Sequence, residues 1–263
     1  MEVQLNGARI HYRRSGAGFP VVFLHAGVAD SRMWEPQASG LGSHFDVIAP
    51  DMRGYGESEL PTEPWSTTAD VLALMEALGL RQAPHIVGCS IGGGAAVDFA
   101  LEHPERVSKL VLVGAGVGGQ PYDDKYEHLF AEATAAEEAK DLAALNEAEM
   151  KLWLVGQGRT ADHIDKRLQD LFLDMNGRAL RSDFDSAPRK RLDPPAFGRL
   201  GEVNAPTLVV VGDHDLPDVQ ETADLLVSKI PNARKAVVHD AAHLPNLEHP
   251  EKFNRLLLDF LNG

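Results

Sequence analysis

Short, continuous apolar runs recur along the first part of the chain, where they alternate with more polar segments. Such runs are typical of strands that are buried on both faces of a parallel sheet. They occupy residues 21–24, 45–49, 85–89 and 109–113. Two shorter strands are expected before them, at 2–6 and 9–14, joined by the turn-forming pair Asn6-Gly7.

The segments between these runs have a helical pattern. Residues 67–78 place most of their apolar side chains near one side of a helix, and residues 91–102 form a helical pattern directly after a predicted strand. The first pattern ends at Gly79 and the second stops before Pro104, and both residues are typical helix terminators. Strands that alternate with helices predict an α/β fold with a mostly parallel sheet.

The pattern changes between residues 118 and 203. Strand-like runs disappear, and residues 126–154 and 162–175 are rich in good helix formers. Sheet-like sequence resumes at 206–211, followed by a helix, a last strand at 236–239 and a closing helix. We therefore predict a core made of residues 1–117 and 204–263, with residues 118–203 as a small helical cap insertion.

Charge and cysteine content narrow the range of functions. The 263 residues carry a formal net charge of −14, which disfavours a nucleic-acid partner, and the single cysteine, Cys89, allows no internal disulfide. Residues 1–6 lack the features of a signal peptide, and no apolar run approaches the ~20 residues of a membrane span. We expect a cytoplasmic protein that does not bind membranes. Its oligomeric state stays open.

The sharpest local motif is Gly88-Cys89-Ser90-Ile91-Gly92. It fits the G-x-S-x-G nucleophile elbow, in which a strand turns abruptly into a helix and exposes a serine at the tip. The alternative is a glycine-rich turn with an ordinary serine. The apolar run before the motif and the helical pattern after it favour the elbow, so we predict that Ser90 is a nucleophile.

Several sequence blocks together resemble the α/β-hydrolase superfamily, in its short-cap branch of esterases, lactonases, C–C hydrolases and perhydrolases. Besides the elbow, they are Phe23-Leu24-His25-Ala26-Gly27, Asp51-Met52-Arg53-Gly54-Tyr55-Gly56-Glu57-Ser58, His103-Pro104-Glu105-Arg106-Val107, Gly212-Asp213-His214-Asp215 and Ala242-His243-Leu244-Pro245. The resemblance implies a mostly parallel eight-stranded sheet flanked by helices.

The fold that the chain resembles carries its catalytic groups in the order serine, acid, histidine. His243 lies between the last predicted strand and the closing helix, at the sheet edge where Ser90 is expected. Its rivals are His239, at the end of the strand, and His249, at a helix start. The loop around His243 is similar to the family's histidine loop, although Ala242 replaces the usual glycine. We expect His243 to be the general base.

Three aspartates compete for the role of the acid. The family places it at the last position of G-[DE]-x-D, which corresponds to Asp215 here. We expect Asp213 to cap the turn through its own backbone amides, and Asp218 is the remaining candidate. The alternative family position, after residues 109–113, holds no acid, which supports Asp215 as the residue that orients His243.

The resemblance also implies an oxyanion hole, formed by backbone amides. One donor is the residue after the nucleophile, Ile91. The family's H-G-x pattern corresponds to His25-Ala26-Gly27, so the second donor is the amide of Gly27, with alanine in place of the first glycine. Trp34 and Trp153 are candidates for lining the substrate pocket, and packing in the core is the alternative for both.

These residues predict a serine hydrolase that cleaves carboxylic esters or lactones of small to medium, largely apolar substrates through an acyl-enzyme. We expect no cofactor and no metal, and a small-molecule substrate as the only partner. A C–C bond hydrolase or a cofactor-free perhydrolase would use the same triad. A ligand-binding receptor on the same fold is the non-enzymatic alternative, and multiple turnover would exclude it.

Overall fold

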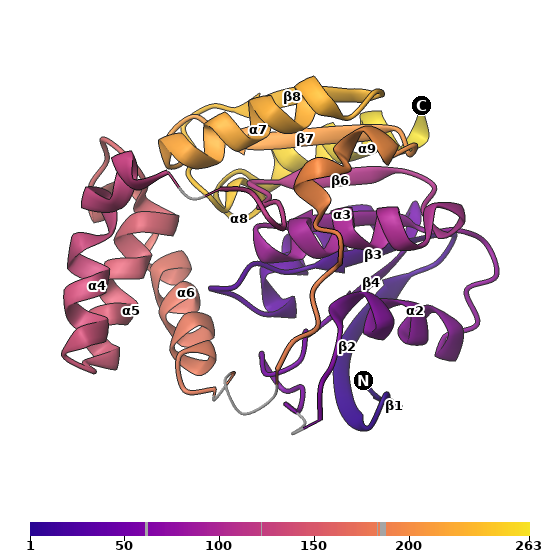
Figure 1. Ribbon diagram of the computed structural model, residues 1–263, viewed down its shortest axis with the longest axis horizontal. Helices are drawn as coiled ribbons and strands as arrows, with labels where there is room; N and C mark the ends of the chain where they lie inside the picture. Colours follow the sequence, from indigo (N-terminus) through magenta and orange to yellow (C-terminus); the bar gives the residue numbers. More distant parts are fainter. Residues whose placement is uncertain (61–62, 122, 183, 185–187) are drawn as a thin grey trace.

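A mixed sheet runs through the centre of the computed structural model (Figure 1), which describes residues 1–263 except 61–62, 122, 183 and 185–187. Its strands are β1 (Glu2–Leu5), β2 (Ala8–Gly16), β3 (Phe19–Leu24), β4 (Phe45–Pro50), β5 (His85–Cys89), β6 (Leu110–Val113), β7 (Thr207–Gly212) and β8 (Ala233–Val238). The eight strands lie in the order β1-β2-β4-β3-β5-β6-β7-β8. Only the pairs β1–β2 and β2–β4 are antiparallel, so the predicted mostly parallel sheet of eight strands is confirmed.

Helices cover both faces of the sheet. They are α1 (Glu35–Leu41), α2 (Thr67–Ala77), α3 (Ile91–Glu102), α4 (Ala131–Glu138), α5 (Leu142–Met150), α6 (Lys166–Ala179), α7 (Pro217–Lys229), α8 (Pro245–Glu248) and α9 (Pro250–Asn262). None of these helices has both the length and the apolar character that a membrane crossing needs.

The alternation of side chains along the buried strands divides the core into two layers. Val21 and Phe23 of β3 pack with α1 and α9, whereas Val22 and Leu24 pack with α2, α3 and α7. A strand with apolar residues at successive positions fills both layers at once, which explains the continuous apolar runs in the sequence.

The helices α4, α5 and α6, which we call the cap helices, stand beside the sheet (Figure 1). The helical stretch expected over residues 126–154 is broken between α4 and α5. Lys140 takes a positive φ of 55°, and Asp141 then caps α5 by accepting hydrogen bonds from the amides of Ala143 and Ala144. A side-chain cap satisfies amides that have no partner inside the helix, so it favours a new helix start there.

The last part of the expected insertion packs against the core rather than among the cap helices. Ala196, Leu200 and Val203 are buried in the layer that contains α3. Upstream, Trp65 and Arg189 form an isolated parallel bridge. The chain thus returns from α6 along the α3 face before it enters β7.

Candidate active site

Ser90 stands at the turn between β5 and α3 with a φ of 54° and a ψ of −117°. A positive φ is unusual for a residue with a side chain and marks local strain. The neighbouring glycines allow the turn: a Cβ on Gly92 would lie 2.4 Å from the Leu24 oxygen, and one on Gly88 would lie 2.3 Å from the Gly92 oxygen. The amide of Ser90 donates to the Val113 oxygen over 2.9 Å, which ties the turn to β6.

His243 and Asp215 are brought together from two separate loops. Asp215 follows β7, His243 follows β8, and both side chains are buried. The Nδ1 atom of His243 lies 2.9 Å from Oδ2 of Asp215, and Oδ1 of Asp215 also accepts from the Leu216 amide. If Nδ1 donates its proton to Asp215, Nε2 is left as an acceptor.

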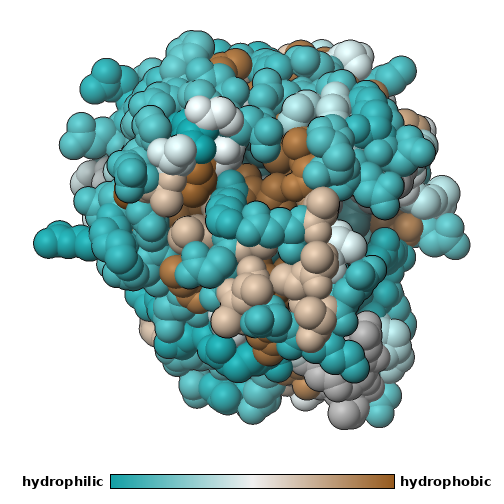
Figure 2. All heavy atoms as spheres, turned by 90° about the vertical axis from the view of Figure 1, so that its left-hand side faces the viewer, coloured by the Kyte–Doolittle hydropathy of each residue, from teal (hydrophilic) through white to brown (hydrophobic). Residues whose placement is uncertain are grey.

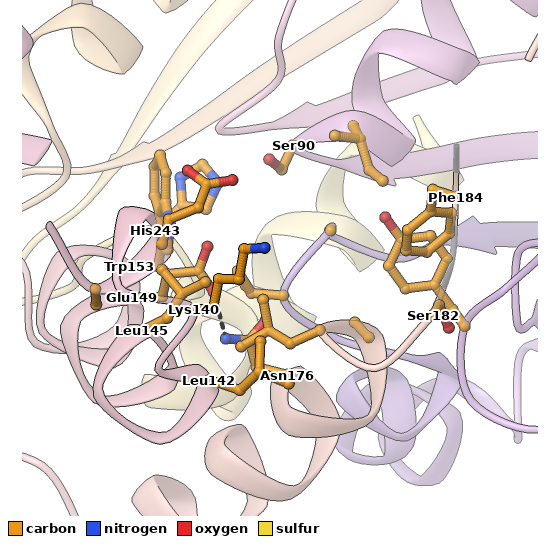
Figure 3. Close-up of a pocket in the computed structure, with 18 residues that line it drawn as sticks. Ser90, Lys140, Leu142, Leu145, Glu149, Trp153, Asn176, Ser182, Phe184 and His243 are labelled. Atoms are coloured by element: carbon orange, nitrogen blue, oxygen red, sulfur yellow. Dashed lines mark hydrogen bonds between the residues drawn. The ribbon is translucent and has the colours of Figure 1, made fainter. Parts of the chain in front are cut away.

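The Nε2 atom of His243 is buried and has no hydrogen-bond partner among the described residues. Figure 3 shows the Ser90 hydroxyl and the His243 ring at the same end of the pocket, yet no hydrogen bond joins them. Such bonds are often long before substrate binds. An unpartnered acceptor on this side of the ring is the group that a general base needs.

Gly114 also belongs to this arrangement, although it was not among the residues predicted from the sequence. Gly114 follows β6 with a φ of 49°, and a Cβ there would lie 2.9 Å from Cε1 and Nδ1 of His243. The signal in the sequence is the Gly-Ala-Gly run after the predicted strand, which also shows that no acid stands at that position. Glycine lets the β6 loop approach the His243 ring.

The residues that compete with His243 and Asp215 in the sequence make other contacts. Asp213 accepts hydrogen bonds from the Asp240 amide over 2.7 Å and from Nδ1 of His239 over 2.9 Å. The expectation that Asp213 caps its own turn is therefore wrong, because its carboxylate holds the turn after β8 instead. Nε2 of His249 contacts the Asp240 oxygen, away from Ser90.

Gly27 and Ile91 line the same cavity as Ser90, as an oxyanion hole requires. The loop before Gly27 is held by His25, whose Nε2 accepts from the Met52 amide over 2.9 Å and whose Nδ1 donates to the Ala26 oxygen over 2.8 Å. Burial lowers the pKa of His25, so the ring stays neutral. Ala26 is fully buried in this loop.

The two candidate tryptophans occupy different places. Trp153 lines the cavity, with its ring centroid 4.6 Å from that of His243. Trp34 is fully buried in the core against Phe23 and Phe253 and does not line the cavity around Ser90. The candidate role of Trp34 in lining the pocket is therefore wrong, and the alternative, packing in the core, is what the structure shows. Its aromatic bulk fills the layer between the sheet and α9.

The cavity has a volume of about 530 Å³ and lies between the sheet edge and the cap helices (Figure 3). Figure 2 shows the cap side of the molecule, where apolar side chains gather around a hollow in a largely polar surface. The lining is mostly apolar; its apolar members include Val28, Ile91, Ala136, Leu142, Leu145, Ala179, Leu180 and Phe184. Such a lining suits an apolar substrate.

Polar side chains interrupt this lining: besides Ser90 and His243, they are Tyr55, Glu137, Lys140, Glu149, Asn176 and Ser182. Glu149 accepts a hydrogen bond from Nδ2 of Asn176 over 2.6 Å, and burial raises the pKa of the Glu149 carboxyl. The Lys140 ammonium extends into the cavity in Figure 3. Tyr55 lines the cavity near Gly27, and burial raises the pKa of its hydroxyl to about 12, so this group stays protonated.

A second cavity, of about 350 Å³, shares Ser90, Trp153 and His243 with the first. Residues 114–117 line it on one side and Asp218 and Glu221 of α7 on the other. Burial raises the pKa of Asp218. Ser90 and His243 therefore lie where the two cavities meet.

Comparison with known proteins identifies the family. A model of the alpha/beta hydrolase fold matches residues 20–250, so the chain belongs to the α/β-hydrolase family and is a hydrolase. The expected resemblance and fold are thereby confirmed.

The chain is similar to hydrolases of more than one chemistry. It is 31% identical to a 2-hydroxy-6-oxo-6-phenylhexa-2,4-dienoate hydrolase of Burkholderia cepacia, over 100% of this chain and 94% of the relative. An enol-lactonase of Burkholderia xenovorans LB400 superposes with a TM-score of 0.80 at 26% identity, over 100% of both chains. An esterase of Exiguobacterium antarcticum gives 0.82 at 25% identity, over 100% of this chain and 99% of the other.

Proposed function

We propose that the protein is a serine hydrolase that cleaves carboxylic esters or lactones through an acyl-enzyme. The observation that carries this proposal is the free Nε2 of His243, with Nδ1 held by Asp215 and with Ser90, Gly27 and Ile91 lining the same cavity. These are the parts that acyl transfer needs: a nucleophile, an oriented base and amides for the oxyanion.

In this mechanism, the Ser90 hydroxyl attacks the substrate carbonyl while His243 takes its proton. The amides of Gly27 and Ile91 stabilise the oxyanion. His243 then protonates the leaving alcohol, which for a lactone stays attached to the acyl group. Water, activated by His243, releases the acid and frees Ser90. Asp215 stays ionised and keeps the imidazole oriented.

A C–C bond hydrolase is the second candidate, because the relative from Burkholderia cepacia is a dienoate hydrolase. A dienoate carries a carboxylate, and Lys140 is the only cationic side chain among the described residues that line the first cavity. Glu137 and Glu149 line it too, and Asp123, Asp218 and Glu221 line the second. This excess of carboxylates favours a neutral ester or lactone.

The test is turnover of p-nitrophenyl esters from acetate to octanoate by the wild type and by Ser90→Ala. We expect the wild type to turn over and the variant to lose all activity above background, with a fluorophosphonate labelling only the wild type, at Ser90 by mass spectrometry. The matched control is Cys89→Ala: the Cys89 thiol is buried and burial raises its pKa, so this variant should keep its activity.

Turnover that persists in Ser90→Ala contradicts the assignment of the nucleophile. Turnover of 2-hydroxy-6-oxo-6-phenylhexa-2,4-dienoate that exceeds that of every ester and lactone in kcat/KM would move the assignment to the C–C hydrolase.

A further inference from the structure

One short segment of the chain, residues 153–159, touches both loops that hold the predicted base and acid. It follows α5 and leads toward α6. On the side of the acid loop, the Gln157 amide donates to the His214 oxygen over 2.7 Å, and Nδ1 of His214 donates to the Gln157 oxygen over 2.8 Å. His214 directly precedes Asp215, so these two hydrogen bonds hold the acid loop against the cap.

The same segment contacts the histidine loop. The His243 amide donates to the Trp153 oxygen over 3.2 Å, and the two rings pack with their centroids 4.6 Å apart. Gly156 makes the close approach possible: with a φ of 76°, a Cβ there would lie 2.4 Å from the His214 oxygen and 2.5 Å from Cβ of Ala242. The backbone of the segment thus packs directly on both loops.

Arg159 fastens this contact with a buried ion pair. The Nη2 atom of its guanidinium lies 2.7 Å from Oε2 of Glu248, and both side chains are 4% exposed. The other carboxylate oxygen, Oε1, accepts from the Ala242 amide over 2.7 Å. Arg159 also donates to the Asp240 oxygen over 2.9 Å. The Asp240 oxygen and the Ala242 amide are therefore both held, so the backbone is fixed directly before His243.

The rest of the guanidinium binds the cap itself. Its Nε donates to the Val155 oxygen over 2.7 Å, and its Nη2 donates to the Leu154 oxygen over 3.1 Å. A planar guanidinium can serve all of these acceptors at once, whereas an ammonium cannot. Arg159 is thus a rigid link between the cap and the histidine loop.

We propose that Arg159 and Glu248 are positioning residues, which use the cap to hold His243 at the distance and angle that proton transfer from Ser90 requires. The proposal rests on the proposed function. It implies that residues 153–159, between α5 and α6, must stay in place during turnover, because their displacement would move the base and the acid together. Small displacements of a base lower rates steeply.

The experiment compares Arg159→Met, Glu248→Gln and the double variant Arg159→Met/Glu248→Gln. Each single variant leaves one buried group without its ionic partner, which lowers stability, whereas the double variant removes both charges and restores part of the Tm. Rates are measured well below each Tm with the best p-nitrophenyl ester, and active sites are counted by fluorophosphonate labelling. We expect kcat per active site to fall about 10- to 100-fold in all three variants, with KM changed by less than about threefold.

The matched control is Arg14→Met. Arg14 makes a two-pronged ion pair with Asp46, over 2.9 and 2.7 Å, at the start of β4 and therefore at the sheet edge opposite Ser90. This variant should lower the Tm and leave kcat per active site within twofold of the wild type.

The double variant decides the outcome. A kcat per active site that stays more than threefold below the wild type supports the positioning role, whether or not the Tm recovers, because the control loses an ion pair without losing rate. A kcat within threefold of the wild type overturns it and leaves the pair a merely structural role. A wild type that neither turns over esters nor reacts with the fluorophosphonate would instead contradict the proposed function.

Discussion

At the scale of single residues, glycines set how closely the backbone can approach the proposed catalytic groups. Gly88 and Gly92 let the Ser90 turn form, and Gly114 lets the β6 loop lie beside the His243 ring. The first two were recognisable from the motif, because both flank Ser90 in sequence. Gly114 was not, because its neighbour is more than a hundred positions away along the chain. The importance of a glycine depends on what a Cβ would meet there.

We predict that Gly114→Ala lowers kcat by about 10- to 100-fold, because the added Cβ would lie 2.9 Å from the His243 ring and would push the base out of place. Gly79→Ala is the control. Gly79 also has a positive φ, of 68°, but none of the residues that the structure describes has an atom within 4 Å of an added Cβ. Steady-state kinetics and thermal unfolding of both variants separate the clash from backbone strain. Equal kcat in the two variants would contradict the contact with His243.

A second residue-scale prediction concerns Asp98 on α3. Its Oδ1 is buried with no hydrogen-bond partner among the described residues, and burial raises the pKa of the carboxyl to about 6 in spite of the opposing attraction of Arg189. An unfolded aspartate has a pKa of about 3.8. The folded state therefore takes up the proton first as the pH falls, and the ionised carboxylate destabilises the fold above pH 6.

Asp98→Asn should accordingly raise the free energy of unfolding at pH 8, by about 1 kcal/mol. This gain in stability should shrink as the pH falls from 6 to about 3.8, the pKa of an unfolded aspartate, because the wild-type carboxyl then becomes protonated and is neutral like the asparagine. Urea unfolding at pH 8 and pH 4 measures it, with the exposed Asp162→Asn as the reference. A gain that is the same at both pH values would refute the assignment of the ionised group.

At the scale of elements, helix and strand ends decide where functional groups lie. Ser90 comes before the first turn of α3, Asp215 lies between β7 and α7, and His243 lies between β8 and α8. All three follow the carboxyl ends of parallel strands, where ligands bind in folds of this class. The connection from α5 to α6 acts differently: residues 153–159 support the loops of Asp215 and His243 from the cap side.

We predict that Gly156→Ala lowers kcat by about 10-fold or more, because its Cβ would strike the His214 oxygen and the Ala242 side chain and force the cap away from both loops. Gly158→Ala is the closest available control. Its φ, 73°, is nearly that of Gly156, at 76°, yet no atom of the described part of the chain lies within 4 Å of an added Cβ. Similar kcat values for the two variants would show that the contact between cap and loops does not matter for the rate.

At the scale of the whole molecule, charge bears on which substrates reach Ser90. The chain carries a formal net charge of −14, and carboxylates outnumber cations along the described lining of both cavities. Such a field repels anionic substrates and attracts cationic ones, and salt screens it. Lys140 is the local exception in the first cavity.

We predict that kcat/KM for mono-p-nitrophenyl succinate lies at least about 10-fold below that for p-nitrophenyl butyrate at low salt, and that the ratio narrows when the ionic strength rises to about 0.3 M. Lys140→Met should lower kcat/KM further for the succinate ester alone. An anionic ester that is preferred at low salt would contradict this prediction and would favour a carboxylate-bearing substrate.

The sequence was sufficient to predict those features that depend on residues close together along the chain. Apolar runs predicted the buried strands, because a strand covered on both faces needs apolar side chains at successive positions, and the pentapeptide around Ser90 predicted a strand-to-helix turn with that serine at its tip. It also supplied the family order from which Asp215 and His243 were chosen. The apolar character of the two tryptophans did not reveal that Trp34 packs in the core while Trp153 lines the cavity, because both environments favour a large apolar side chain.

The sequence by itself therefore determined the fold class and the candidate nucleophile, base and acid, because these depend on the order of elements and on short motifs. Only the tertiary structure decided which residues meet. It showed that Asp213 holds the turn after β8, that Gly114 lies against the His243 ring, and that Arg159 reaches Glu248. These contacts join residues that are distant in sequence, and their energies depend on distances that exist only after the sheet and the cap have packed together.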